Sequence, residues 1–270
     1  MHNKYIFIKW FILFLPLFLG SCKRNFQYSV LEVRPYENDL NNKAIAAIKE
    51  LTPKDTFSFL VISDTQIAYD ELQDFVEHAN GLSEDSIAFV LHGGDYTDYG
   101  ANFEYNFYYD EIKKLKFPIV GTIGNHDMLG NGRYIYRKFL GSEEFTFEYG
   151  NTAFVVFNSN SREVAFDGSI PNLPWLEQTV NSLKQKKNIV YLSHISPQNS
   201  DYDQRMAERH KNIVLEQSNS RLSLHGHTHS YEYYETEGGF KYVVVPTILK
   251  RSYVKVDVAD TTLTVHELFY

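Results

Sequence analysis

Short apolar runs alternate with segments of helical spacing from Thr56 to the C-terminus, and this alternation limits the possible folds more than any other feature. The apolar runs 57–63 (FSFLVIS) and 87–91 (IAFVL) are typical of strands that are covered on both faces. Between them lies an apolar stripe with helical spacing that stops at Gly81, formed by Leu72, Phe75, Val76 and Ala79. Strand and helix in alternation predict an α/β domain whose sheets are covered by helices.

The alternation of strands and helices continues over residues 56–270, which we expect to form one domain. Further strands are expected at 118–123, 189–192 and 222–224, with a 145–158 hairpin that turns at Gly150-Asn151. Helices are expected around Phe103, Phe107 and Leu115, and after Pro174 through Leu176, Val180 and Leu183. The segments 231–235, 240–245, 254–258 and 263–268 are expected to form an antiparallel series.

Composition excludes several classes of protein. With 43% hydrophobic and 22% charged residues in 270, the chain is globular and not largely disordered. A single cysteine excludes an intrachain disulfide framework and a Cys-rich zinc module. The net charge of −8 argues against a nucleic-acid-binding surface, although bound metal ions could still hold a phosphate group.

The N-terminus has the pattern of an export signal. Lys4 and Lys9 precede the apolar run 10–19, which as a helix would rise only about 15 Å, too short for a bilayer core of roughly 30 Å. The run ends in Leu-Gly-Ser-Cys22, which resembles the lipobox of bacterial lipoproteins. This resemblance implies a signal peptide over 1–21 and lipidation of Cys22. An ordinary signal peptide or hydrophobic anchor is the alternative.

We therefore expect a lipoprotein of the bacterial cell envelope, anchored to the membrane at its N-terminus and facing the periplasm or the exterior. Residues 22–55 are expected to form a polar tether followed by a short helix that ends at Thr52-Pro53. The apolar positions of that helix are Leu40, Ala44, Ile48 and Leu51.

Polar residues follow five of the predicted strands, where α/β sheets place their ligand crevices. These residues are Asp64 and Gln66, Asp95, Asn125 with His126 and Asp127, His194, and His227 with His229. Any one of them alone could be structural, but five clusters at strand ends indicate one site. Imidazole, carboxylate and amide groups together suit borderline divalent metals, and the set is large enough for two ions that share a carboxylate. Two ions about 3.5–4 Å apart can hold the attacking and leaving oxygens of a phosphoryl displacement.

The order of these polar motifs along the chain resembles that of a known family. The order of Asp64, Gly-Asp95, Gly-Asn-His-Asp127, His194 and Gly-His-Thr-His229 resembles the calcineurin-like metallophosphoesterases from about Phe57 to the C-terminus. The resemblance implies a four-layer α/β/β/α sandwich with mixed sheets. It also implies hydrolysis of a phosphomonoester or phosphodiester substrate by a metal-bridging hydroxide.

The resemblance further implies individual roles, with two divalent ions (Mn, Fe or Zn) as cofactors. Asp64, Gln66 and His229 would serve one metal, and Asp95 would bridge to the second. The ligands of the second metal would be Asn125, His194 and His227. His126 would contact the substrate phosphate and protonate the leaving group, and Asp127 would orient its ring. Asn125 and Arg133 are further candidates for substrate binding, although a solvated loop arginine is the common alternative.

Two positions depart from the family pattern. Gln66 stands where many members have histidine, and its amide oxygen is a poorer ligand for a borderline metal. Gln66 therefore leaves open a second function, a catalytically impaired, lipid-anchored metal- or ligand-binding protein of the same fold. Asp98 stands where purple acid phosphatases have tyrosine. A metallo-β-lactamase type of hydrolase would need a His-x-His-x-Asp-His run, which is absent.

Substrate identity has no readable code in the sequence. The segments 128–140, 160–173 and 196–212 are the expected determinants of selectivity. His92 and His225 precede the glycines of two motifs, and we expect them to be packed strand residues or to support the ligands from behind.

Overall fold

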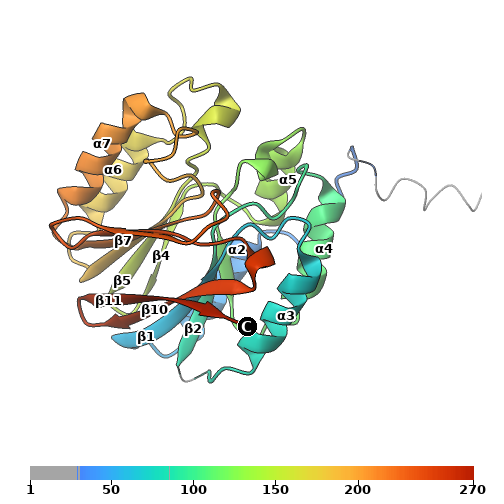
Figure 1. Ribbon diagram of the computed structural model, residues 1–270, viewed down its shortest axis with the longest axis horizontal. Helices are drawn as coiled ribbons and strands as arrows, with labels where there is room; N and C mark the ends of the chain where they lie inside the picture. Colours follow the sequence, from blue (N-terminus) through green and yellow to red (C-terminus); the bar gives the residue numbers. More distant parts are fainter. Residues whose placement is uncertain (1–28, 30, 85) are drawn as a thin grey trace, which may run out of the picture.

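The structure is a computed structural model that describes residues 29, 31–84 and 86–270. The expected signal peptide over 1–21 and the lipidation site Cys22 lie outside the described residues. Figure 1 shows two sheets stacked face to face, with α6 and α7 outside one of them and α3 and α4 outside the other. The four-layer α/β/β/α sandwich with mixed sheets expected from the sequence is confirmed.

The first sheet has the strand order β11-β10-β1-β2-β3. Its strands are β1 (Thr56–Ile62), β2 (Ile87–His92), β3 (Ile119–Gly121), β10 (Ser252–Ala259) and β11 (Thr262–Phe269). β1, β2 and β3 run parallel, whereas β10 pairs antiparallel with both β1 and β11. The parallel strands therefore end on the same edge of the sheet, where the residues after β1, β2 and β3 meet.

The second sheet has the strand order β4-β5-β6-β7-β9-β8. Its strands are β4 (Phe145–Tyr149), β5 (Thr152–Val156), β6 (Asn188–Leu192), β7 (Ser220–His225), β8 (Glu232–Glu235) and β9 (Lys241–Val244). The four central strands are parallel, and β4 and β8 close the two edges antiparallel. The predicted hairpin at 145–158 is confirmed, with Gly150 at φ 55° in its turn.

Side chains that alternate along β1 explain why the layers stack in this way. Phe57, Phe59 and Val61 belong to the core between the two sheets, while Leu60 and Ile62 face the core under the helices. The helices on that side are α3 (Tyr69–Asn80), α4 (Asn102–Ile112) and α5 (Gly132–Phe139). A third core lies under α6 (Leu173–Ser182) and α7 (Gln204–Leu215) on the outer face of the second sheet.

Helix α2 (Leu40–Glu50) is the short helix expected before Thr52, and it packs into the domain that follows it. Ile45 and Ile48 of α2 are buried in the core between the sheets. Asn41 exchanges two hydrogen bonds with the main chain of Gly121, each 2.9 Å long. Through these contacts α2 lies against β3 and β4 at one side of the sandwich.

The expected antiparallel series over 231–268 is wrong in its pairing. β8 pairs with β9 and β10 with β11, but β9 runs parallel to β7 and β10 lies in the other sheet beside β1. The chain crosses between the sheets because Val254, Val256 and Val258 of β10 complete the core between them. All three expected selectivity segments are also partly helical, since α5 lies within 128–140, η3 (Ser161–Val164) lies within 160–173 and α7 begins within 196–212.

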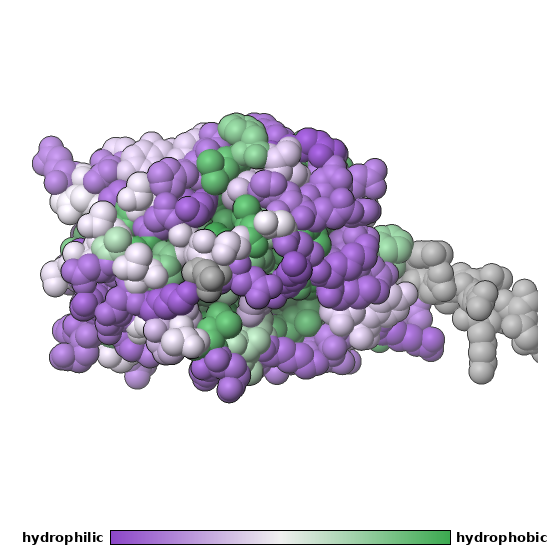
Figure 2. All heavy atoms as spheres, turned by 90° about the horizontal axis from the view of Figure 1, so that it is seen from below, coloured by the Kyte–Doolittle hydropathy of each residue, from purple (hydrophilic) through white to green (hydrophobic). Residues whose placement is uncertain are grey.

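The described part of the chain contains no helix of sufficient length and hydrophobicity to cross a bilayer. In the view of Figure 2, hydrophilic side chains cover most of the surface and hydrophobic ones are visible between them. Most of the buried hydrophobic residues belong to the three cores described above, and the buried residues that follow β1 and β2 at the site are polar.

Candidate metal centre

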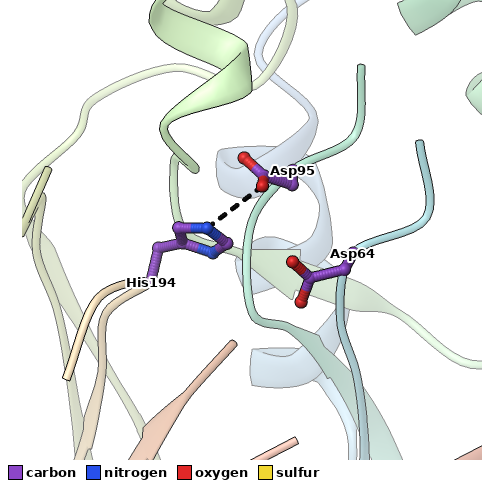
Figure 3. A group of neighbouring side chains, drawn as sticks. All are labelled: Asp64, Asp95 and His194. Atoms are coloured by element: carbon purple, nitrogen blue, oxygen red, sulfur yellow. Dashed lines mark ion pairs between the residues drawn. The ribbon is translucent and has the colours of Figure 1, made fainter. Parts of the chain in front are cut away.

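Asp64, Asp95 and His194 form a buried group at the carboxyl ends of β1, β2 and β6. One potential ligand atom from each lies within 4.8 Å of the other two, and all three side chains are buried. Figure 3 shows Asp64 and Asp95 on neighbouring strand ends of one sheet and His194 approaching from the other. His194 Nε2 lies 3.1 Å from Asp95 Oδ2. The group therefore joins the two sheets at their shared edge.

Asn125 and His227 extend this group on one side. Asn125 Oδ1 lies 3.0 Å from His194 Nε2 and 3.0 Å from His227 Nδ1. His194 Nδ1 lies 2.7 Å from the carbonyl oxygen of Gly93, so it carries a hydrogen and donates it. The lone pair of neutral His194 Nε2 then faces the oxygens of Asp95 and Asn125. Such converging lone pairs repel one another unless a proton or a metal cation lies among them.

His229 and Gln66 lie on the Asp64 side. His229 Nε2 is 3.3 Å from Asp64 Oδ1, and Asp64 also accepts bonds of 3.2 Å from the main-chain N–H of His227. Gln66 is only 6% exposed, and its Oε1 has no hydrogen-bond partner among the described residues. A buried amide oxygen without a partner costs free energy, so this atom is available to a ligand.

The backbone at this site is strained. Asp64, Asp95, His227 and His229 all have positive φ, between 53° and 75°. For non-glycine residues this conformation costs on the order of 1–3 kcal/mol each, and such residues cluster at functional sites. Gly124 allows a close approach here, since a Cβ at that position would lie 2.0 Å from Asp95 Oδ1. The chain therefore bends tightly at the strand ends to bring these side chains together.

The carboxylates of Asp64 and Asp95 create a strongly negative environment around His194. Burial alone would lower the pKa of His194, but the Asp95 and Asp64 carboxylates and the Gly93 carbonyl raise it to about 9. Burial alone would raise the pKa of Asp95, but the positive charge of His194 keeps it below its usual value. The same surroundings that stabilise a proton on His194 would stabilise a metal cation in its place.

His126 is held by a different residue from the one expected. Its Nδ1 lies 2.8 Å from the carbonyl oxygen of Asp98 and 3.6 Å from Asp98 Oδ1. The expectation that Asp127 orients this ring is therefore wrong. His126 Nε2 has no hydrogen-bond partner within the described ranges, so this nitrogen is available to another group. The contact of His126 with Asp98 spans 28 positions of the sequence, so no local pattern indicates it.

Asp127 instead binds the main chain that carries the ligands. Its buried carboxylate accepts hydrogen bonds from the N–H groups of Asp95, Tyr96, Thr97 and Gly124 and from the Thr97 hydroxyl. Burial and the charge of Asp95 raise the pKa of Asp127 to about 7. Asp127 does not hold the His126 ring because main-chain N–H groups and the Thr97 hydroxyl occupy its carboxylate oxygens.

Arg133 also differs from its expected role in phosphate binding. It lies in α5, and its Nε and Nη2 donate to Oε1 and Oε2 of Glu143 at 2.8 and 2.9 Å. Glu143 is buried and also accepts bonds from Arg137 and Asn158. The forked face of Arg133 that would bind phosphate is occupied by this carboxylate.

Three further residues, His92, Thr247 and Asp201, support the site. Thr247 and Asp201 belong to no sequence motif. His92 is buried, with Nδ1 accepting from the Gly94 N–H at 3.1 Å and Nε2–H donating to Thr65 Oγ1 at 3.0 Å. Thr247 Oγ1 donates to the carbonyl oxygen of Asp64 at 2.9 Å. Asp201 Oδ2 lies 3.0 Å from His227 Nε2. Thr247 and Asp201 lie far from their partners in the sequence, so only the tertiary structure reveals them.

The donor set fits divalent metal ions. Histidine nitrogens, carboxylate oxygens and an amide oxygen converge at the strand ends, and Gln66 adds a buried oxygen that lacks a partner. This combination lacks cysteine, unlike the Cys-rich structural zinc sites. Asp95 has a ligand atom within 4.8 Å of ligand atoms of both His194 and Asp64, as a shared carboxylate would.

Comparison with known sequences gives two findings. The family model described as "Calcineurin-like phosphoesterase" matches residues 57–231, more than half of the chain. A probable glycerophosphodiester phosphodiesterase GpdQ from Arcobacter nitrofigilis is 29% identical over 133 residues, which cover 46% of this chain. The chain spans only about half of that relative, 47% of its length.

Comparison with solved structures shows the same fold. A dimetal phosphatase from Danio rerio has a TM-score of 0.64 at 12% identity, covering 81% of this chain and 100% of its own. A purple acid phosphatase from yellow lupin (Lupinus luteus) seeds has a TM-score of 0.60 at 13% identity, covering 79% of this chain and 51% of its own. At these identities the likeness concerns the arrangement of layers and strands.

Proposed function

Because the chain belongs to the calcineurin-like phosphoesterase family, we propose that it is a metal-dependent phosphoesterase that hydrolyses a phosphomonoester or a phosphodiester. The observation that carries this proposal is the convergence of Asp95 Oδ2, Asn125 Oδ1 and His194 Nε2 beside Asp64. Converging lone pairs of this kind do not stabilise a protein core, but they are the ligands of a divalent cation that can also bind phosphate oxygens.

The residues divide into two groups that would hold two ions. Asp64, Gln66 and His229 would serve one ion, Asn125, His194 and His227 the other, and Asp95 both. Bound divalent ions would supply a water of lowered pKa and neutralise charge on the phosphoryl group. His126 would then act on the substrate itself in its protonated form, in which Asp98 holds Nδ1–H and Nε2–H gives its proton to the leaving oxygen.

The relative named as a probable glycerophosphodiester phosphodiesterase supports including diesters among the substrates to be tested. We propose that Mn, Fe or Zn serves as the cofactor, since all three suit mixed imidazole and carboxylate ligands.

The test uses the purified full chain loaded with Mn or Zn, with an aryl phosphate and its diester as substrates. We expect cleavage of at least one of them, and loss of that activity in Asp95→Ala. Asp110→Asn, which changes an exposed aspartate on α4, is the matched control and should keep wild-type activity. If wild type and Asp95→Ala cleave both substrates equally slowly, the proposal is wrong.

His126→Gln separates catalysis from metal binding. We expect kcat to fall by about 10²–10⁴-fold, the usual contribution of a general acid, while two ions stay bound. Wild-type protein that binds two ions but cleaves no phosphoester would instead favour the alternative of a catalytically impaired binding protein, for which Gln66 is the motivating residue.

For the location we propose a lipid anchor on Cys22 in the bacterial cell envelope. The support is the sequence alone: the apolar run 10–19, the lipobox-like Leu-Gly-Ser-Cys22 and the absence of any other cysteine. We expect the wild type to label with a radioactive fatty acid and to fractionate with membranes. Cys22→Ser should lose the label, and a wild type without label would contradict the anchor.

A further inference from the structure

The ring of His227 contacts a carboxylate through the nitrogen that points away from the candidate metal ligands. Its Nδ1 faces the amide oxygen of Asn125 at 3.0 Å, on the side where ligand atoms converge. Its other ring nitrogen, Nε2, lies 3.0 Å from Asp201 Oδ2. Because a carboxylate oxygen only accepts, Nε2 carries the hydrogen of this bond. The lone pair of neutral His227 is thereby assigned to Nδ1, the nitrogen that faces the site.

His194 is held in the same manner by a weaker acceptor. Its Nδ1–H donates to the carbonyl oxygen of Gly93 at 2.7 Å, and Nε2 faces Asp95 and Asn125. Each of the two histidines thus presents one nitrogen to the ligand cluster and has the other occupied by an acceptor. Acceptors of this kind fix the tautomer and the ring orientation of metal-binding histidines and make them more basic.

Asp201 is itself held in place by a cation from another segment. Arg162 in η3 (Ser161–Val164) donates from Nη1 to Asp201 Oδ2 at 2.6 Å, the same oxygen that faces His227. The main-chain N–H of Asp201 also donates to Asn199 Oδ1 at 2.8 Å. The Asp201 side chain is 21% exposed and that of Arg162 is 48% exposed, so this pair lies at the edge of the site.

The two segments that meet here follow different strands of the second sheet. Arg162 comes after β5 and Asp201 after β6, whereas His227 comes after β7. Because β5, β6 and β7 are parallel neighbours, the chain after each of them leaves the sheet on the same edge. The contact chain from Arg162 through Asp201 to His227 therefore crosses three consecutive strand ends.

We propose that Asp201 is a positioning residue that fixes His227 for metal binding, and that Arg162 holds Asp201 in its place. This inference rests on the proposed function, since it concerns one of the two metal positions. Asp201 touches neither metal nor substrate in this scheme and acts only through His227. Removing Asp201 or Arg162 would change the orientation and the basicity of the His227 ring.

The experiment measures metal binding by isothermal titration calorimetry with Mn on the purified, metal-depleted full chain, without substrate. We expect Asp201→Ala to raise the Kd of one of the two ions by about 10–100-fold, the usual effect of losing such a partner. Asp201→Asn keeps an acceptor oxygen, so its loss should be smaller. Arg162→Gln should weaken the same ion by less than about tenfold, since Asn199 still contacts Asp201.

The matched control is Glu177→Gln, which breaks another ion pair beside the second sheet, that of Arg209 and Glu177 at 2.9 Å. It should bind both ions as the wild type does, and a thermal melt of every variant establishes that it is folded. Wild-type affinity for both ions in Asp201→Ala, or an equal loss for both ions, would overturn the inference. If the wild type and Asp201→Ala both bind two ions with the same affinities, this inference is wrong and the proposed function is unaffected.

Discussion

Asp127 Oδ2 accepts a 2.9 Å hydrogen bond from the main-chain N–H of Asp95, the residue proposed to serve both metals. The same oxygen accepts at 2.9 Å from the N–H of Gly124, which precedes Asn125. One buried carboxylate thus joins the strand ends of β2 and β3, and with them two ligands from different segments. The acid of the Gly-Asn-His-Asp motif acts here on the backbone, whereas the ring of its neighbour His126 is held by Asp98.

We therefore predict that Asp127→Asn destabilises the fold, although it conserves shape. All of the partners of this carboxylate are donors, so the amide NH2 of asparagine would face N–H groups and leave them without acceptors. The free energy of unfolding should fall by about 3 kcal/mol, as expected when a buried charged acceptor is lost. Urea unfolding of the metal-depleted protein, at a pH well above the pKa of about 7 so that this carboxylate is ionised, measures it. Asp110→Asn, which is exposed, should change stability by less than about 0.5 kcal/mol. An equally small change in Asp127→Asn would contradict the role given to this carboxylate.

Gln66→His tests the departure from the family pattern. An imidazole nitrogen binds borderline metals better than an amide oxygen does, and this buried position has an oxygen that lacks a protein partner. We predict that the Kd of one of the two ions falls by about tenfold, equivalent to about 1.4 kcal/mol, with the stoichiometry unchanged. Calorimetry with Zn measures the change, and Gln73→His on the exposed side of α3 is the control. Unchanged affinity would mean that Gln66 does not face a metal.

Arg133→Gln distinguishes a structural arginine from a substrate-binding one. Because Arg133 binds the buried Glu143 through two hydrogen bonds, we predict a loss of about 1–2 kcal/mol in the free energy of unfolding. The KM for the aryl phosphate or diester that is cleaved should change by less than about twofold, or under 0.5 kcal/mol. Arg209→Gln, which removes an exposed pair, is the control for stability. A rise in KM without a loss of stability would restore the expectation that Arg133 contacts substrate.

His210 makes stability depend on pH at a distance from the metal site. Burial lowers its pKa from 6.5 to about 4, so the unfolded chain binds a proton between these values and the folded chain does not. The free energy of unfolding is therefore lowered as the pH falls from 6.5 to 4, by on the order of 3 kcal/mol for this residue. His210→Gln should show a correspondingly shallower fall than the wild type, measured by urea unfolding in EDTA. His266→Gln, at a half-exposed position, should keep the steep profile, and parallel profiles for wild type and His210→Gln would refute the prediction.

Most strands and the grouping of candidate ligands could be predicted from the sequence, because both depend on local patterns. The apolar run 57–63 corresponds to β1 (Thr56–Ile62), and its alternate residues Phe57, Phe59 and Val61 face the core between the sheets. Helix α5 was not predicted, although Ile135, Tyr136 and Phe139 are buried at helical spacing. Its apolar stripe is short and lies within a polar segment, so the periodic signal is weak.

The sequence by itself determined which residues stand at the ends of strands, since hydrophobic periodicity and the polar residues after it are properties of neighbouring positions. Only the tertiary structure decided which groups those residues contact. Asp127 binds backbone, His126 is held by Asp98, and β10 joins β1. Asp201 reaches His227 from another strand end. These contacts depend on how distant strands pair and where each loop leaves its sheet, and no local pattern encodes that geometry.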